Sequence, residues 1–329
     1  MKLLLTTFFA ATAAAAQAFD PGIRIVSPTE GQVFEPGDTV NIVVELLDPN
    51  FVGGISGSMT FFGAFSDEEA PYELSATVSE RASGTLTVTA RAFTYDGSRF
   101  TNHKAQPVHI IVRRSTPPDR LIVESSVSIR TPRPVNDVNP PRILVKGIYG
   151  DVEVDLRSSV TGTTYVSSDP GIVTVDSEGV LTPVSLGRAV VTVENQGVKD
   201  FSMIDVSDSE GLTPPEEVTG RLDIQRSGIR LNRRTGMFIQ RVTITNPTEL
   251  PIGGSMALIL EGLTPGVTAV NRTTSTDRIL PGSPQFDIPM DSRLHSLLPG
   301  TTVTFDIEFV NPNRQRIQYT PRVFVAREF

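Results

Sequence analysis

Val40-Asn41-Ile42-Val43-Val44-Glu45-Leu46 is the stretch that decides the fold, because its apolar side chains recur at every second position. Most of the intervening residues are polar or β-branched, which is typical of a strand with one buried face and one wet face. The same alternation returns at residues 86–92, and no sustained helical period follows residue 18. The sequence therefore predicts an antiparallel all-β chain and disfavours a parallel α/β architecture. Turn dipeptides separate the alternating runs, as at Asp96-Gly97, Glu178-Gly179 and Pro299-Gly300.

Residues 1–18 have the features of a secretory signal peptide. A positive charge at the second residue precedes an uncharged apolar run over residues 3–16, and Ala16-Gln17-Ala18 places small residues where a signal peptidase cuts. The run is shorter than a membrane-spanning helix, and Asp20-Pro21-Gly22 interrupts any continuation. We expect cleavage before Phe19 and a secreted, extracellular or cell-surface protein. A periplasmic location and an uncleaved anchor are the alternatives.

Two features of the composition limit the possible partners. The chain contains no cysteine, so we expect its domains to be held together by burial alone, as fits bacterial export. The net charge of −8 argues against nucleic acid, which requires a basic footprint. No later stretch reaches membrane-spanning length. Residues 220–329 are locally basic, with 13 cations that are all Arg against 9 carboxylates.

Two proline pairs divide the chain into thirds. They lie in Thr116-Pro117-Pro118-Asp119 and Thr213-Pro214-Pro215-Glu216. Consecutive prolines cannot continue a sheet ladder and favour an extended spacer between domains. We therefore predict three domains after the signal peptide, at residues 19–116, 120–208 and 220–329, each the size of one sandwich.

The first two thirds resemble bacterial immunoglobulin-like modules. In the first, residues 23–28 with residues 31–40 look like the opening two strands of such a module. In the second, Tyr165-Val166-Ser167-Ser168-Asp169-Pro170, followed by residues 173–175, 179–182 and 187–193, resembles the bacterial immunoglobulin-like group 2 family over most of 140–206. The resemblance implies an immunoglobulin-like sandwich. Family members often carry Trp where this chain has Tyr165, so the Tyr hydroxyl needs a hydrogen-bond partner.

The last third resembles the fibronectin type III and CARDB-like sandwiches of secreted bacterial proteins. The resemblance rests on residues 242–247, 258–267 and 305–312. Asn246-Pro247 and Asn311-Pro312 are each predicted to end a strand, because Asn caps turns and Pro donates no hydrogen bond. The fold class predicted for the whole chain is all-β, with tandem immunoglobulin-like antiparallel β-sandwiches after a cleaved signal peptide.

The common catalytic motifs are missing from the sequence. It has no Gly-x-Ser-x-Gly elbow, phosphate-binding loop, dinucleotide-binding turn or His-Glu-x-x-His helix. His103, His109 and His295 are interpreted as solvated surface side chains rather than as a triad or zinc site. The acidic run Asp67-Glu68-Glu69 is interpreted as a solvated loop, because adjacent carboxylates cannot flank a glycosidic bond. We therefore predict no catalytic, cofactor-binding or metal site.

Three surface clusters are candidates for binding. The first is the acidic linker of Asp205, Asp208, Glu210, Glu216 and Glu217, which is a solvated linker or, as the alternative, a calcium clamp. The second is an aromatic group of Phe61, Phe62 and Phe65, which is core packing or, as the alternative, a carbohydrate platform. The third comprises Arg233, Arg234, Arg314 and Arg316, which form a solvated face or, as the alternative, a contact for an anionic surface polymer.

These observations favour a non-enzymatic structural or adhesive protein that presents tandem sandwiches. A carbohydrate- or cell-envelope-binding accessory protein is the alternative, and an enzyme with an unfamiliar site is the third hypothesis. The expected partner is a protein or polysaccharide at the cell surface or in a matrix. The oligomeric state and calcium binding at the domain junctions stay open, because sandwich folds host many functions.

Overall fold

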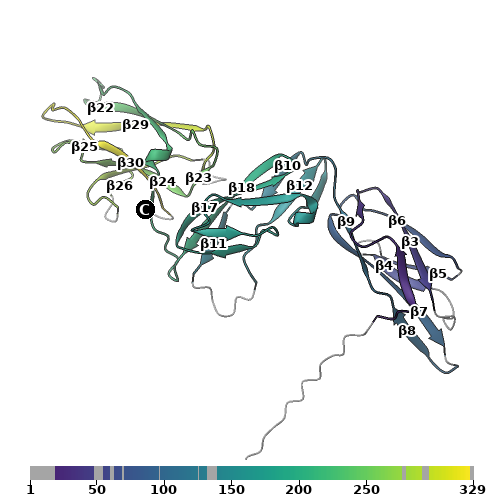
Figure 1. Ribbon diagram of the computed structural model, residues 1–329. Coiled ribbons are helices and arrows are strands. Elements are labelled where there is room, and N and C mark those ends of the chain that lie inside the picture. Colours follow the sequence, from purple (N-terminus) through teal and green to yellow (C-terminus); the bar gives the residue numbers. More distant parts are fainter. Residues whose placement is uncertain are drawn as a thin grey trace, which may run out of the picture. The chain divides into compact units, whose positions relative to one another are not determined.

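The computed structural model describes residues 19–47, 55–59, 63–68, 70–95, 97–124, 126–131, 139–275, 279–290 and 296–326. The chain divides into two compact units, Met1–Thr116 and Pro117–Phe329. The described residues are all-β, with strands and two short 3-10 turns but no α-helix (Figure 1). Within these ranges, no helix has the length and apolarity that crossing a membrane requires. The predicted all-β class is confirmed, whereas the predicted signal peptide lies outside the described residues.

The first unit contains two sheets. One has the order β1-β3-β6 and the other has the order β2-β9-β7-β4-β5, with β8 paired to the far end of β7. The bounds are β1 Ile23–Ser27, β2 Val33–Phe34, β3 Thr39–Leu46, β4 Ile55–Met59, β5 Gly63–Asp67, β6 Tyr72–Thr77, β7 Gly84–Tyr95, β8 Phe100–Lys104 and β9 Val108–Val112.

The predicted alternation forms the core of this unit. In β3, the side chains of Val40, Ile42 and Val44 are buried, while the residues between them are less buried. In β7, Leu86 and Val88 are fully buried and face the same cluster. Each apolar side chain of this size contributes about 1.5–3 kcal/mol when it is removed from water.

The second unit begins with a sandwich of three sheets. Their orders are β10-β12-β13, β11-β18-β17-β14 and β15-β16. The bounds are β10 Arg120–Val123, β11 Ser126–Arg130, β12 Val145–Tyr149, β13 Val152–Asp155, η1 Ser159–Thr161, β14 Thr163–Ser167, β15 Val173–Val175, β16 Leu181–Pro183, β17 Gly187–Asn195 and β18 Val198–Ser207.

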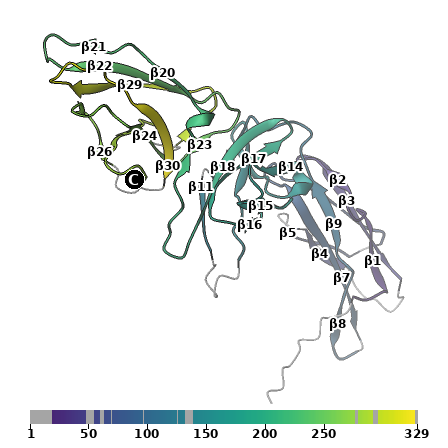
Figure 2. The ribbon, with the colours of Figure 1, turned by 60° about the vertical axis from the view of Figure 1, so that its left-hand side comes forward.

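The same unit continues with a second sandwich (Figure 2). Its sheets have the orders β19-β30-β24-β27-β26, β20-β22-β29-β25 with β21 on β22, and β23-β28. The bounds are β19 Glu216–Glu217, η2 Thr219–Arg221, β20 Asp223–Arg226, β21 Arg230–Leu231, β22 Phe238–Thr245, β23 Ile252–Gly253, β24 Ser255–Glu261, β25 Thr268–Ala269, β26 Thr274–Ser275, β27 Pro284–Asp287, β28 Ser296–Leu297, β29 Thr302–Val310 and β30 Thr320–Ala326.

Two strand pairs depart from the antiparallel pattern. β2 pairs in parallel with β9, and β11 pairs in parallel with β18. Each parallel pair joins strands far apart in sequence, as parallel neighbours require, because a tight hairpin produces only antiparallel pairs. The other described pairs between these strands are antiparallel, including the nine-residue β17–β18 hairpin register.

The described residues form three separate hydrophobic clusters. One lies in the first unit, one lies within residues 121–206 and one lies within residues 218–325. The second unit therefore holds two cores in one compact body. The division of the chain into three domains stays a prediction.

Both Asn-Pro pairs follow the ends of strands. β22 ends at Thr245, directly before Asn246, and β29 ends at Val310, directly before Asn311. Both asparagine side chains are buried. The prediction that these pairs end strands is confirmed, because each asparagine hydrogen-bonds its own turn.

Candidate functional site

The carboxylates of the acidic linker, the candidate calcium clamp, contact different partners and do not converge on one point. Asp205 lies 3.8 Å from the Arg188 guanidinium and accepts a hydrogen bond from the Thr213 hydroxyl. Asp208 accepts hydrogen bonds from the backbone N–H groups of Glu210 and Leu212 and so closes its own turn. These two carboxylates stabilise local chain geometry rather than a shared site.

Two further carboxylates of the linker pair with arginines of the last sandwich, whereas Glu210 is exposed. Glu216 lies 2.8 Å from Arg221, and Glu217 lies 2.8 Å from Arg322. The Arg322 contact holds the pKa of Glu217 below its usual value. Among the residues whose positions are described, no three His, Cys, Asp or Glu side chains converge to hold a metal ion.

The expectation that His103 is a solvated surface side chain is wrong. Its Nδ1 lies 2.5 Å from Asp20, its Nε2 lies 2.8 Å from the Thr94 hydroxyl, and only 20% of the side chain is exposed. Asp20 also accepts a hydrogen bond from Gly22 N–H at 2.7 Å, which is the main reason that its pKa is lowered. This cluster ties the first described residues to the β7–β8 hairpin.

Asp20, His103 and Thr94 contact one another in the order carboxylate, imidazole, hydroxyl, which is also the order in a nucleophilic triad. Whether a substrate could reach the Thr94 hydroxyl therefore decides between catalysis and packing. The cleft beside Asp20 is lined by residues 19–21, 23–25 and 106–109 together with Glu30, and Thr94 is not among its lining residues. Catalysis requires a reacting atom to approach the nucleophile. We therefore assign these contacts to packing.

The remaining histidines and the aromatic candidates contribute no described site. His109 is partly exposed beside Glu30, whose carboxylate accepts its backbone N–H at 2.8 Å. Glu68 is exposed. Other candidates lie wholly or by their side chains outside the described residues, namely Phe61, Phe62, Phe65, Asp67, Glu69 and His295.

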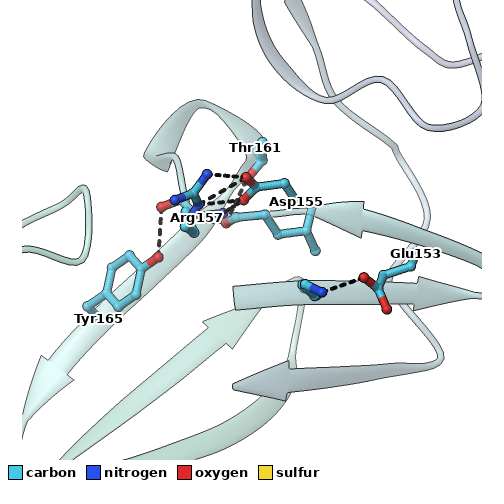
Figure 3. A network of polar contacts seen from close by, with 7 residues as sticks. Glu153, Asp155, Arg157, Thr161 and Tyr165 are labelled. Atoms are coloured by element: carbon cyan, nitrogen blue, oxygen red, sulfur yellow. Dashed lines mark hydrogen bonds and ion pairs between the residues drawn. The ribbon is translucent and has the colours of Figure 1, made fainter. Parts of the chain in front are cut away.

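A polar network lies at the corner between β13 and β14 (Figure 3). The Arg157 guanidinium forms two-pronged contacts with both oxygens of Asp155, with Nε 2.9 and 3.0 Å from them. Tyr165 donates its hydroxyl to the Arg157 carbonyl at 2.7 Å, which confirms that this hydroxyl needs a partner. Burial raises the pKa of Tyr165, so the phenol stays protonated and acts as a donor. The network fixes a turn and supplies no catalytic base.

A cleft of about 420 Å³ lies within the second unit. Its lining comes from β11, β17 and β18 on one side and from residues 251–255 on the other. Its carboxylates are paired with its arginines, Asp205 with Arg188 and Glu216 with Arg221. Its described lining includes four serines but neither histidine nor cysteine.

The four candidate arginines of the last sandwich are brought together at one end of it. Leu231 pairs with Phe238, and Phe238 pairs with Phe309 of β29. The turn 232–237 therefore leaves the sheet beside the segment that follows β29, as the neighbouring paths of β21, β22 and β29 show (Figure 2). This places Arg233-Arg234 and Arg314 on adjacent turns.

The second of these turns is held firmly in place. Asn311 closes it, since its amide donates to the Gln315 carbonyl at 2.7 Å while its carboxamide oxygen accepts the Gln315 N–H at 3.2 Å. Gln315 in turn donates to the Pro265 carbonyl at 2.6 Å, which joins connection 311–319 to connection 262–267. Arg314 has a φ of +50°, so the backbone turns sharply at this arginine.

We call connections 232–237, 262–267 and 311–319 the arginine end. The side chains of Arg233, Arg234, Arg314 and Arg316 are all exposed. None of them has an ion pair with a carboxylate in the described part of the chain. The sequence showed these arginines as two separate pairs, and their proximity depends on the β22–β29 register, which the sequence does not reveal.

Comparisons with known proteins give no family. No protein-family model matches the chain, and no curated protein matches it. Solved structures that resemble it include fibronectin(III)-like modules of Clostridium thermocellum CbhA, with 25% identity over 27% of this chain and 93% of that chain and a TM-score of 0.24.

Two further similar structures cover most of this chain. Extracellular domains 3–5 of Drosophila OTK match at 11% identity over 94% of this chain and 98% of that one, with a TM-score of 0.26. Domains 1–6 of the surface layer protein SbsC match at 13% identity over 93% of this chain and 39% of that one, with a TM-score of 0.23. TM-scores this low carry no argument, so the all-β assignment rests on the strands and registers themselves.

Proposed function

We propose that this chain is a non-enzymatic, secreted or cell-surface protein with a structural or adhesive role, which presents tandem immunoglobulin-like modules. The observation that supports it is the distribution of charge among the described residues. Four of the five linker carboxylates and His103 are engaged in contacts within the sandwiches, whereas the arginines of the arginine end are exposed without carboxylate partners among the described residues. A surface of this kind is suited to contact another molecule.

The same proposal includes the finer organisation predicted from the sequence. It comprises export by a cleaved signal peptide, three domains, a group 2 bacterial immunoglobulin-like module in the second and a fibronectin type III or CARDB-like module in the third. The buried valines of β17 and the hydrogen-bonded hydroxyl of Tyr165 support the second assignment. The strand ends at both Asn-Pro pairs support the third.

Adhesion to cells tests this function. Surfaces coated with the purified full chain are exposed to cells of the native host and then washed under controlled flow. We expect the coated surface to retain cells above the level of an albumin-coated surface, because an adhesive module contacts the cell exterior. Retention equal to that on albumin, together with absence of the chain from washed cell envelopes, would falsify the adhesive role.

The alternative is an accessory protein that binds carbohydrate or the cell envelope. For this accessory role, the arginine end is a better candidate binding surface than an aromatic platform. Its described connections contain four arginines and a single ring, Tyr319, which is half-buried. Sedimentation of the chain with isolated envelopes separates the two functions. Envelope binding without cell retention would favour the accessory role.

A further inference from the structure

The arginine end is a surface of one charge. Its three connections hold four arginines and no aspartate, glutamate or lysine. They lie at the same end because connection 311–319 runs from the end of β29 in one sheet to the start of β30 in the other. Phe238 pairs with Phe309 near one end of this connection, and Glu261 pairs with Thr320 at the other. Residues 279–283, which precede β27, lie at the same end.

Nearby carboxylates are largely occupied by other arginines. Asp306 on β29 lies 2.9 Å from Arg241, and Glu261 at the end of β24 lies 3.0 Å from Arg322. Glu308 of β29 pairs with Ile239 and remains on the outer face of the sheet, one pair in from the end. The local field at the arginine end is therefore positive, although the whole chain has a net charge of −8.

The chemistry of the surface indicates the class of ligand. A guanidinium presents a planar fork of donors that matches a carboxylate. The amides of Asn313 and Gln318 are exposed between the arginines and can donate to and accept from hydroxyl groups. Single-stranded nucleic acid would require aromatic rings on which its bases stack. Tyr319 is the only ring in these connections, and the Arg226 guanidinium carbon already lies over it, 5.0 Å from the ring centroid.

We propose that the arginine end binds an acidic polysaccharide through its uronate carboxylates. This inference rests on the proposed adhesive function and names the partner that this function would use. The four arginines contact successive carboxylates along the polymer, while the neighbouring amides contact sugar hydroxyls. Because the guanidinium groups are exposed, the attraction is screened by salt and depends on several contacts at once.

The test measures binding of the full chain to polygalacturonate by biolayer interferometry at low and physiological salt. The binding variants are Arg233→Gln with Arg234→Gln, Arg314→Gln with Arg316→Gln, and all four together. The matched control is Arg24→Gln with Arg221→Gln, which changes the net charge as much as either pair but removes exposed arginines whose carboxylate partners, Glu45 and Glu216, lie outside the arginine end. Dextran supplies a neutral polymer, and a DNA duplex supplies a polyanion without sugar carboxylates.

We expect each pair of substitutions to weaken polygalacturonate binding by about tenfold and all four to abolish it, whereas the control variant changes it by less than about threefold. Binding should weaken as salt is added, and dextran should not bind. Equal losses in the control variant, salt-insensitive binding or tighter binding to DNA would overturn the inference. If cells are retained by the quadruple variant as by the wild type, the adhesive function stands and the assigned partner is wrong.

Discussion

The Tyr165 hydroxyl stabilises the sandwich formed by β10–β18 through one partly buried hydrogen bond. Tyr165→Phe keeps the ring but leaves the Arg157 carbonyl without its donor. We expect the free energy of unfolding to fall by about 1 kcal/mol, measured by chemical denaturation. The neighbouring Val166 is 64% exposed, so Val166→Ala provides a control that should change it by less than about 0.5 kcal/mol. Equal effects of the two substitutions would show that the hydroxyl contributes nothing.

Glu178 gives the same sandwich a defined response to acid. The Ser159 hydroxyl, 2.6 Å away, is the main cause of the lowered pKa of Glu178, helped by the Ser159 N–H at 3.1 Å. A lowered pKa in the folded state adds stability that is complete above the ordinary value near 4.5 and is lost as the pH falls through the folded value.

The Glu178→Gln variant should therefore be less stable than the wild type at pH 7, and the difference should shrink towards pH 3. Thermal unfolding followed at half-unit pH steps measures this. Glu124→Gln, at an exposed position of the same sandwich, separates loss of charge from loss of the Ser159 contacts. A difference between Glu178→Gln and wild type that stays constant with pH would contradict the prediction.

At the scale of the strands, the alternation of buried and exposed residues could be predicted from the sequence, but the pairing of one strand with another could not. The inward faces of β3 and β7 follow from a period of two, because burial on one face selects apolar residues at every second position. The parallel pairing of β11 with β18 could not be predicted, since it joins residues 126–130 to residues 203–207. Two-residue strands such as β23 were also missed, because they are too short to show a period.

The arginine end shows the same limit for the candidate site. Its arginines were visible in the sequence, but their proximity follows from a register between β22 and β29 that is fixed by long-range packing. The partners of the linker carboxylates were likewise hidden. Glu217 contacts Arg322, more than a hundred residues further along the chain, and no local pattern reveals such a contact.

The end of β22 depends on Asn246 to hold the connection that follows it. The buried Asn246 amide donates to the Leu250 and Leu297 carbonyls at 2.9 and 2.8 Å, and its oxygen accepts from Thr248. Asn246→Ala leaves these groups unpaired, so we expect the free energy of unfolding to fall by about 2–4 kcal/mol in denaturant titrations. The exposed Asn313→Ala is the control. A loss below about 0.5 kcal/mol would show that water replaces the amide.

At the scale of the whole molecule, the grouping of residues 117–329 into one unit was not predicted. The linker prolines suggested a spacer between separate domains, yet Gly253 of the last sandwich packs against Met203 of β18. Arg188 of β17 also donates to the Val325 carbonyl of β30 at 3.3 Å. Such contacts join residues distant in sequence, so composition alone cannot reveal them.

Gly253 is the position at which this packing can be broken. A Cβ atom there would overlap the end of the Met203 side chain, so Gly253→Leu displaces Met203 and weakens the contact between the two sandwiches of the second unit, while a Cβ atom at the exposed Gly228 meets no atom within 4 Å. We expect limited proteolysis, followed by mass spectrometry, to cut residues 208–216 at least several-fold faster in Gly253→Leu than in Gly228→Leu. Loosening exposes a linker whose Thr213 is otherwise buried and bonded to Asp205. Circular dichroism should stay all-β, since both cores remain intact. Equal cleavage rates in the two variants would show that the sandwiches are independent and that the linker alone sets their separation.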